Sequence, residues 1–207
     1  MTAFDWITAI IVIVIIIYVG FVQTVGGWII ALRKGQAVTI LPERAGRKWP
    51  LWIYITLLIF ESALLVLFIY FGWRPLFTLS RVTARVLGII GLIIFLLGFV
   101  FAEWARQTLG KYWGISTGMQ VKLLDDHQLI QSGPYAFVRH PMYFGAWVLF
   151  FGLTLLYPVW AVFLMFLSIL IAFIGRARRE EVALSERFGE QWVEYKKHTK
   201  FILPFIY

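Results

Sequence analysis

The sequence contains no cysteine. Disulfide frameworks, thiolate metal sites and cysteine nucleophiles are therefore excluded. Histidine is scarce as well, and the three histidines His127, His140 and His198 lack the tight spacing of a metal-binding motif. We therefore expect no metal centre.

Two further motifs are missing. No glycine-rich loop follows a predicted strand, which excludes a Rossmann-type cofactor site. No serine-centred nucleophile elbow is present either. The sequence therefore disfavours a nucleophilic hydrolase.

Charged residues are few, at 14% of the chain, whereas hydrophobic residues make up 61%. Soluble domains have roughly 25% charged residues. This composition predicts an all-α integral membrane protein surrounded by membrane lipids. The net charge of +8 is not accompanied by a known nucleic-acid motif. We therefore expect no nucleic acid as a partner.

Long apolar runs predict about five transmembrane helices, because a spanning helix needs about 20 apolar residues. The first run contains a β-branched stretch that would favour a strand in water, but a single open strand cannot satisfy its backbone in lipid. The last two runs are joined by the short Tyr157-Pro158 connection, which predicts an antiparallel hairpin. The predicted helices are Trp6–Leu32, Pro50–Phe71, Arg81–Gln107, Pro141–Tyr157 and Val159–Gly175.

Two of these helices carry unusual residues. The second has Glu61 near its middle, and an intramembrane carboxylate is either functional or stabilises helix contacts. Both alternatives stay open. Small residues on the third helix form a seam that predicts close helix packing. These residues are Ala84, Gly88, Gly91, Gly98 and Ala102.

The distribution of basic residues predicts the topology. All of the 19 Lys and Arg residues except Arg74, Arg81 and Arg85 fall on one side of the five predicted helices. The positive-inside rule then places the loop before residue 141 and the C-terminal tail in the cytoplasm, with the N-terminus outside. The N-terminus lacks the basic region of a cleavable signal, so the first run is expected to stay as a helix.

The tail over Arg176–Lys200 is predicted to form a C-terminal amphipathic helix. Its apolar stripe consists of Leu184, Phe188, Trp192 and Tyr195. One interpretation is a helix lying on the headgroups. The other is a lid that closes a site near His140. Arg176 and Glu180 are four residues apart and so face the same side.

The densest run of reactive side chains lies between two apolar runs, in Gly133-Pro-Tyr-Ala-Phe-Val-Arg-His-Pro-Met-Tyr143. Two prolines stiffen its backbone, and Gly133 permits a tight turn. Polar groups kept at a membrane boundary are costly and mark functional sites. We therefore expect the site here.

This stretch carries a family resemblance. His127-Gln-Leu-Ile-Gln-Ser-Gly-Pro-Tyr135, Arg139-His-Pro-Met-Tyr143, Glu180-Glu181 and Phe188-Gly189-Glu190 resemble the isoprenylcysteine carboxyl methyltransferase family, within the wider phospholipid methyltransferase superfamily. The resemblance covers about Glu103 to Pro204. It implies a single membrane domain over residues 1–207, with N-terminal helices in 1–102 and a methyltransferase core in 103–207.

The resemblance further implies a cofactor, S-adenosyl-L-methionine, that leaves as S-adenosyl-L-homocysteine. Glu180 would hold the cofactor and Arg176 would orient the substrate carboxylate, with Arg139 as a further substrate contact. The implied cofactor-binding residues are Gln120, His127, Gln128, Leu129, Ile130, Gly133, Tyr135, His140, Pro141, Met142, Tyr143, Glu180 and Glu181.

The predicted activity is methylation of the carboxylate of a prenylated cysteine or a similar amphiphile that enters from the bilayer. A carboxylate is ionised at neutral pH and needs no general base. The alternative is N-methylation of a lipid amine, which must first lose a proton, with Glu181 or Glu61 as base. An NADPH-dependent sterol-type reductase and a non-catalytic scaffold are further alternatives. The short chain resembles prokaryotic members, which implies the plasma membrane of a prokaryote.

Overall fold

The computed structural model describes residues 2–19, 70–113 and 128–204, with a few helical positions between residues 56 and 68. The second half of the first predicted helix, most of the second helix, and Glu61, Gln120 and His127 lie outside the described residues. The described helices are α1 (Ala3–Ile17), α4 (Arg81–Leu109), η2 (Gly110–Tyr112), η3 (Gly133–Ala136), α5 (Pro141–Leu156), α6 (Trp160–Phe188) and α7 (Glu190–His198).

The β-branched run near the N-terminus is helical, as the membrane argument predicts. A capping box begins α1: the Thr2 backbone N–H donates to Asp5 Oδ2 at 2.6 Å, and the Asp5 N–H donates to Thr2 Oγ1 at 3.4 Å. The start of α1 is held against α4, because Arg85 Nη2 donates to Thr2 Oγ1 at 2.8 Å and its guanidinium lies 4.4 Å from the Phe4 ring centroid.

The predicted small-residue seam is confirmed from Gly91 to Ala102, where α4 packs backbone to backbone on α5. A Cβ added to Gly91 would lie 2.5 Å from the Leu156 nitrogen. At the other end of the contact, a Cβ on Gly145 would lie 2.7 Å from the Ala102 nitrogen. Only glycine permits this approach. The sequence analysis did not predict that glycines of α5, such as Gly145, would face this seam.

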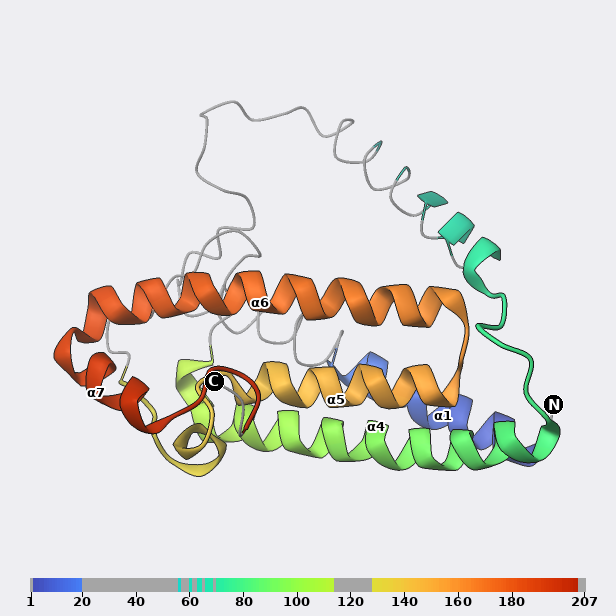
Figure 1. The fold of residues 1–207 in the computed structure, drawn as a ribbon, viewed down its shortest axis with the longest axis horizontal. Helices are drawn as coiled ribbons and strands as arrows, with labels where there is room; N and C mark the ends of the chain where they lie inside the picture. Colours follow the sequence, from blue (N-terminus) through green and yellow to red (C-terminus); the bar gives the residue numbers. More distant parts are fainter. Residues whose placement is uncertain are drawn as a thin grey trace.

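The predicted hairpin is also confirmed. α5 ends at Leu156, and α6 begins at Trp160 and runs back beside it (Figure 1). The Trp160 N–H donates to the Arg74 carbonyl at 3.0 Å, and the Leu76 N–H donates to the Pro158 carbonyl at 2.9 Å. The segment before α4 therefore fixes the hairpin turn.

The predicted boundary between the last apolar run and the tail helix is wrong. Helix α6 continues through Gly175 and Arg176 to Phe188, and Gly189 ends it with φ +50°. Residues 176–188 contain neither glycine nor proline. Because no helix-breaking residue is present, the helix continues past the point where the sequence becomes polar. The apolar stripe that was predicted on a single tail helix is therefore divided: Leu184 and Phe188 lie on α6, and Trp192 and Tyr195 lie on α7.

Four helices meet in the hydrophobic core. Buried residues from α1, α4, α5 and α6 form it, and they are Val12, Phe95, Leu153, Leu156 and Val162. Among the described residues, α4 and α6 are long and apolar enough to cross a membrane, whereas α1 and α5 are apolar but shorter. Large apolar side chains remain exposed along the helices, as expected for a surface that faces lipid. The predicted count of five spans stays a prediction.

Candidate functional site

The loop before α5 is built by the residues singled out in the sequence. Gly133 has φ +58°, and a Cβ there would lie 3.0 Å from Thr108 Oγ1, so glycine allows both the turn and the contact with α4. Pro134 is the second residue of the short helix η3, and Pro134 and Tyr135 are buried. Burial raises the pKa of the Tyr135 hydroxyl above its ordinary value, so the phenol stays protonated.

The end of the chain pairs with this loop. The Lys200 N–H donates to the Phe137 carbonyl at 3.1 Å, and the Arg139 N–H donates to the Lys200 carbonyl at 2.8 Å. The His140 N–H donates to the Phe201 carbonyl at 3.1 Å. Two extended segments that are distant in sequence therefore lie side by side and set the direction in which α5 begins.

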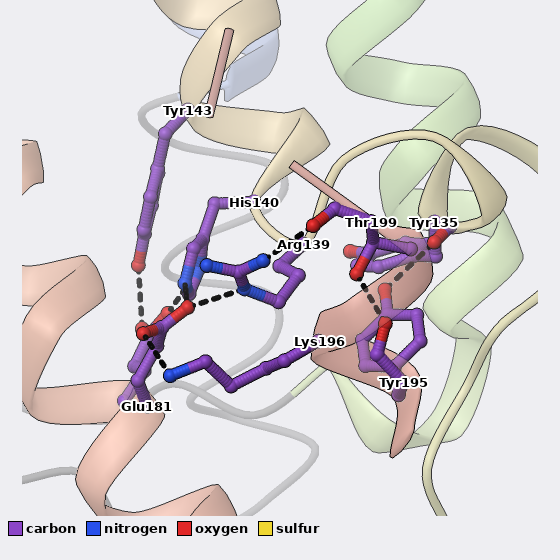
Figure 2. A network of polar contacts seen from close by, with 9 residues as sticks. Tyr135, Arg139, His140, Tyr143, Glu181, Tyr195, Lys196 and Thr199 are labelled. Atoms are coloured by element: carbon purple, nitrogen blue, oxygen red, sulfur yellow. Dashed lines mark hydrogen bonds and ion pairs between the residues drawn. The ribbon is translucent and has the colours of Figure 1, made fainter. Parts of the chain in front are cut away.

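Arg139 connects three parts of the site (Figure 2). Its Nε donates to Glu181 Oε1 on α6 at 2.5 Å, and its Nη1 donates to the Thr199 carbonyl at 2.6 Å. Lys196 of α7 adds a second cation, 3.7 Å from Glu181 Oε2. Behind them, the Tyr195 hydroxyl donates to the Tyr135 carbonyl at 2.7 Å. Loop, α6 and tail are thus joined by charged and hydrogen-bonded contacts.

A second cluster gathers around Glu180. The Tyr143 hydroxyl donates to Glu180 Oε1 at 2.5 Å, and Arg176 Nε lies 3.1 Å from the same oxygen. Arg176 Nε also donates to the Tyr143 hydroxyl oxygen at 2.8 Å. His140 Nδ1 approaches the other carboxylate oxygen of Glu180 at 3.4 Å. One carboxylate is therefore in contact with Tyr143 of α5, Arg176 of α6 and His140 of the loop before α5.

His140 lies between the two glutamates and is buried. Its ring stacks on Tyr143, with centroids 5.6 Å apart. Its Nε2 is 3.8 Å from Glu181 Oε1, and no hydrogen-bond partner for this atom exists within the described part of the chain. Burial lowers the pKa of His140, but the carboxylates of Glu180 and Glu181 outweigh it and raise the pKa above its ordinary value.

Six of the predicted site residues thus come together: Arg139, His140, Tyr143, Arg176, Glu180 and Glu181. Pro141 and Met142 form the first turn of α5 beside them, and Gln128, Leu129 and Ile130 lead into η3. Gln120 and His127 lie outside the described residues. The sequence analysis did not predict the contacts that Thr199, Lys200 and Phe201 make with the loop. This short segment contains no motif that would have indicated them.

Comparison with known proteins decides the family. A family model described as phospholipid methyltransferase matches residues 86–191. The chain belongs to this family. The matched residues include all of α5 and α6, and with them Tyr143, Arg176, Glu180 and Glu181, whereas Lys196 and Thr199 lie beyond the match.

The resemblance to isoprenylcysteine carboxyl methyltransferases that the motifs indicate is confirmed by individual similar proteins. The human protein-S-isoprenylcysteine O-methyltransferase is 34% identical over a segment that covers 58% of this chain and 42% of the human protein. A solved structure of the eukaryotic intramembrane Ras methyltransferase, an isoprenylcysteine carboxyl methyltransferase, is similar with TM-score 0.51 and 31% identity. It matches over 58% of this chain and 43% of that chain.

These matches span less than half the length of either relative. A mouse Delta(14)-sterol reductase is 37% identical, but over only 39% of this chain and 20% of the reductase. The methyltransferase similarity is therefore the more extensive. Together with the apolar helices α4 and α6, the similarity to an intramembrane enzyme identifies the chain as an integral membrane protein.

Proposed function

We propose that this protein is an S-adenosyl-L-methionine-dependent methyltransferase that methylates the carboxylate of a prenylated cysteine or a similar amphiphile. The observation that carries the proposal is the cluster of Arg176, Tyr143 and Glu180, where the α5/α6 contact meets the polar loop. It combines a cation for an acidic substrate with a carboxylate for a cationic cofactor. The similarity to isoprenylcysteine methyltransferases supports the same chemistry.

The residues present fit the cofactor. Its amino group and hydroxyls need acceptors, and its sulfonium is cationic, so a buried carboxylate pair suits it. Glu180 and His140 Nε2, which has no hydrogen-bond partner among the described residues, provide polar atoms beside the loop of residues 128–135. When bound, the cofactor supplies an electrophilic methyl group. The expected cofactor contacts Gln120 and His127 lie outside the described residues, and the by-product of methyl transfer would be S-adenosyl-L-homocysteine.

The chain's own residues then have separate tasks. Arg176 pairs with the substrate carboxylate and orients one oxygen, which is already ionised at neutral pH and needs no general base. Tyr143 holds Glu180 and Arg176 at fixed positions through its hydroxyl. The apolar helices exclude water, which strengthens the electrostatic attraction between the reacting groups.

Methylation of a lipid amine is the alternative, and the contacts of Glu181 disfavour it. An ammonium group must lose a proton before it accepts a methyl group. Glu181, the base that this alternative would use, is held by Arg139 at 2.5 Å and lies 3.7 Å from Lys196. A carboxylate between two cations is a weak base. A carboxylate acceptor avoids this requirement.

We further propose that the site faces the cytoplasm, with about five spans, the N-terminus outside and residues 103–207 as the catalytic core. The basic residues in the C-terminal half of α6, after α6 and in the loop before α5 support this topology. The acceptor enters from the bilayer, in the plasma membrane of a prokaryote.

The test is transfer of labelled methyl from S-adenosyl-L-methionine by the detergent-purified protein. The acceptors are a farnesylated thioether carboxylic acid, phosphatidylethanolamine and a lipid extract. We expect label in a base-labile ester of the acid. Label found only in base-stable lipid would contradict carboxyl methylation and establish the amine alternative.

A further inference from the structure

Phe137 lies in the polar loop before α5 and is 67% exposed, although its neighbours Tyr135 and Val138 are buried. The backbone at this position is fixed on both sides. The Phe137 N–H donates to the Pro134 carbonyl at 3.2 Å, and the Phe137 carbonyl accepts from the Lys200 N–H at 3.1 Å. The ring is therefore held outside the folded loop on a fixed piece of backbone.

The length of α5 places this loop at the edge of the bilayer. At the far end of α5, Trp73 and Trp160 beside the hairpin turn are 56% and 45% exposed, and exposed tryptophans mark a membrane interface. From this turn α5 covers 16 residues, about 24 Å, whereas the hydrocarbon core is about 30 Å thick. Phe137 precedes Pro141 by four residues, at most about 13 Å in a fully extended chain. It therefore lies no farther out than the lipid headgroups.

Helix α6 indicates the same depth for the membrane boundary. Arg178 and Arg179 are exposed and lie roughly 27–29 Å along the helix from Trp160, where arginine side chains reach the headgroups. In Figure 1 the yellow loop before α5 extends past the end of α4, on the side away from α6. A loop that extends sideways from the helices at this depth meets lipid.

We propose that the Phe137 ring inserts into the bilayer, between the phospholipid headgroups of the leaflet beside the site. The partner is the phospholipid bilayer itself, and the contact extends the lipid-facing surface of the helices onto the loop. The tail segment paired with the loop runs in the same direction and adds a second exposed apolar side chain, Leu203. The loop is then held by Arg139 and Glu181 on the side of α6 and by lipid at Phe137. This contact does not depend on the proposed methyl transfer.

Because the chain contains no cysteine, a single introduced thiol can be labelled by itself. Phe137→Cys and Val193→Cys are compared in lipid nanodiscs, which leave both faces of the bilayer open to a reagent. Val193 is the matched control, since it is 54% exposed and lies on α7, beyond the end of α6. We expect a charged maleimide to react about tenfold more slowly with Phe137→Cys, because an apolar environment raises the pKa of a thiol. After denaturation in detergent the two variants should react at equal rates.

Nitroxide-labelled phospholipids then show whether lipid or protein shields the thiol. A fluorophore attached to Phe137→Cys should be quenched strongly by a nitroxide placed near the headgroup and weakly by one near the end of the acyl chain. The fluorophore on Val193→Cys should be quenched by neither lipid.

Equal maleimide rates in the two folded variants overturn the inference. A slow rate without quenching by lipid also overturns it, because the side chain is then covered by protein. Circular dichroism checks that each variant is folded. Leu203→Cys, at the second exposed apolar position, gives the same test with the same expected results if Phe137→Cys does not fold.

Discussion

Arg139 and Glu181 form an ion pair at 2.5 Å that joins the loop before α5 to α6, and their side chains are only 10% and 17% exposed. The same arginine donates to the Thr199 carbonyl, so one guanidinium holds loop, helix and tail together. Because these contacts already occupy it, we propose that Arg139 positions the neighbouring His140. A direct contact with substrate is the weaker proposal.

Arg139→Ala and Glu181→Ala should each lower the free energy of unfolding by about 2 kcal/mol, because each leaves a largely buried charged partner without its hydrogen bond. The double variant should cost little more than either single one, since the pair acts as a unit. Thermal unfolding in detergent measures this. Lys197→Ala removes an exposed ion pair with Glu194 and serves as the control, with no measurable loss expected. Additive losses in the double variant would show that the two residues act independently.

Glu180→Gln should weaken binding of S-adenosyl-L-methionine by about ten- to a hundredfold. The amide keeps an acceptor for the Tyr143 hydroxyl but removes the negative charge, and hydrogen bonds to a charged group are the stronger ones. Calorimetry gives the affinity, and circular dichroism checks that the helices remain. Glu186→Gln changes an exposed glutamate on the same helix and should leave affinity unaltered. If Glu180→Gln bound the cofactor as the wild type does, Glu180 would not belong to the pocket.

The close packing of α4 on α5 should tolerate no side chain at Gly91. A Cβ there meets the Leu156 backbone nitrogen at 2.5 Å, and backbone cannot rotate away. We expect Gly91→Ala to lower the free energy of unfolding by about 1–3 kcal/mol through overpacking. The control is Gly175→Ala in α6, where the nearest atom is Arg179 Nη1 at 3.7 Å and alanine favours the helix. Equal melting temperatures of the two variants would rule out the close contact.

The stability of the ligand-free protein should fall as pH rises above neutrality. The pKa of His140 is raised in the folded state above its ordinary value of 6.5. Its stabilising contribution is therefore complete below that value and is lost as pH rises through the folded pKa. Melting temperatures of the ligand-free protein over roughly pH 5.5 to 9 measure this loss of stability. His140→Asn should remove this part of the pH dependence, and an unchanged profile would assign it to other groups.

Much of the fold follows from the apolar runs, because length and hydropathy are local properties. Helix α4 and the α5/α6 hairpin lie close to where the sequence predicts them, and the spacing of Arg176 and Glu180 correctly predicts their contact. The end of α6 was misplaced because a change from apolar to polar residues reports the membrane surface, whereas the helix ends at Gly189.

The rest of the site depends on contacts between distant residues. Tyr143 meets Glu180 across 37 residues, and Arg139 meets Glu181 across 42. No spacing in the sequence encodes such pairs, because helix packing and chain reversal set them. The family motifs predict which residues form the site, and the structure shows which of them contact one another.

The measurement that tests the account most directly compares Arg176→Gln with the wild type in methyl transfer to N-acetyl-S-farnesyl-cysteine. Arg178→Gln, at an exposed arginine two residues away, is the control. We expect kcat/KM for base-labile label to fall about a hundredfold in Arg176→Gln, the effect of removing a partly buried charged contact to the acceptor. The affinity for S-adenosyl-L-methionine should stay within a few-fold of the wild type. Unchanged transfer by Arg176→Gln, with the control also active, would contradict the assignment of Arg176 to the acceptor carboxylate.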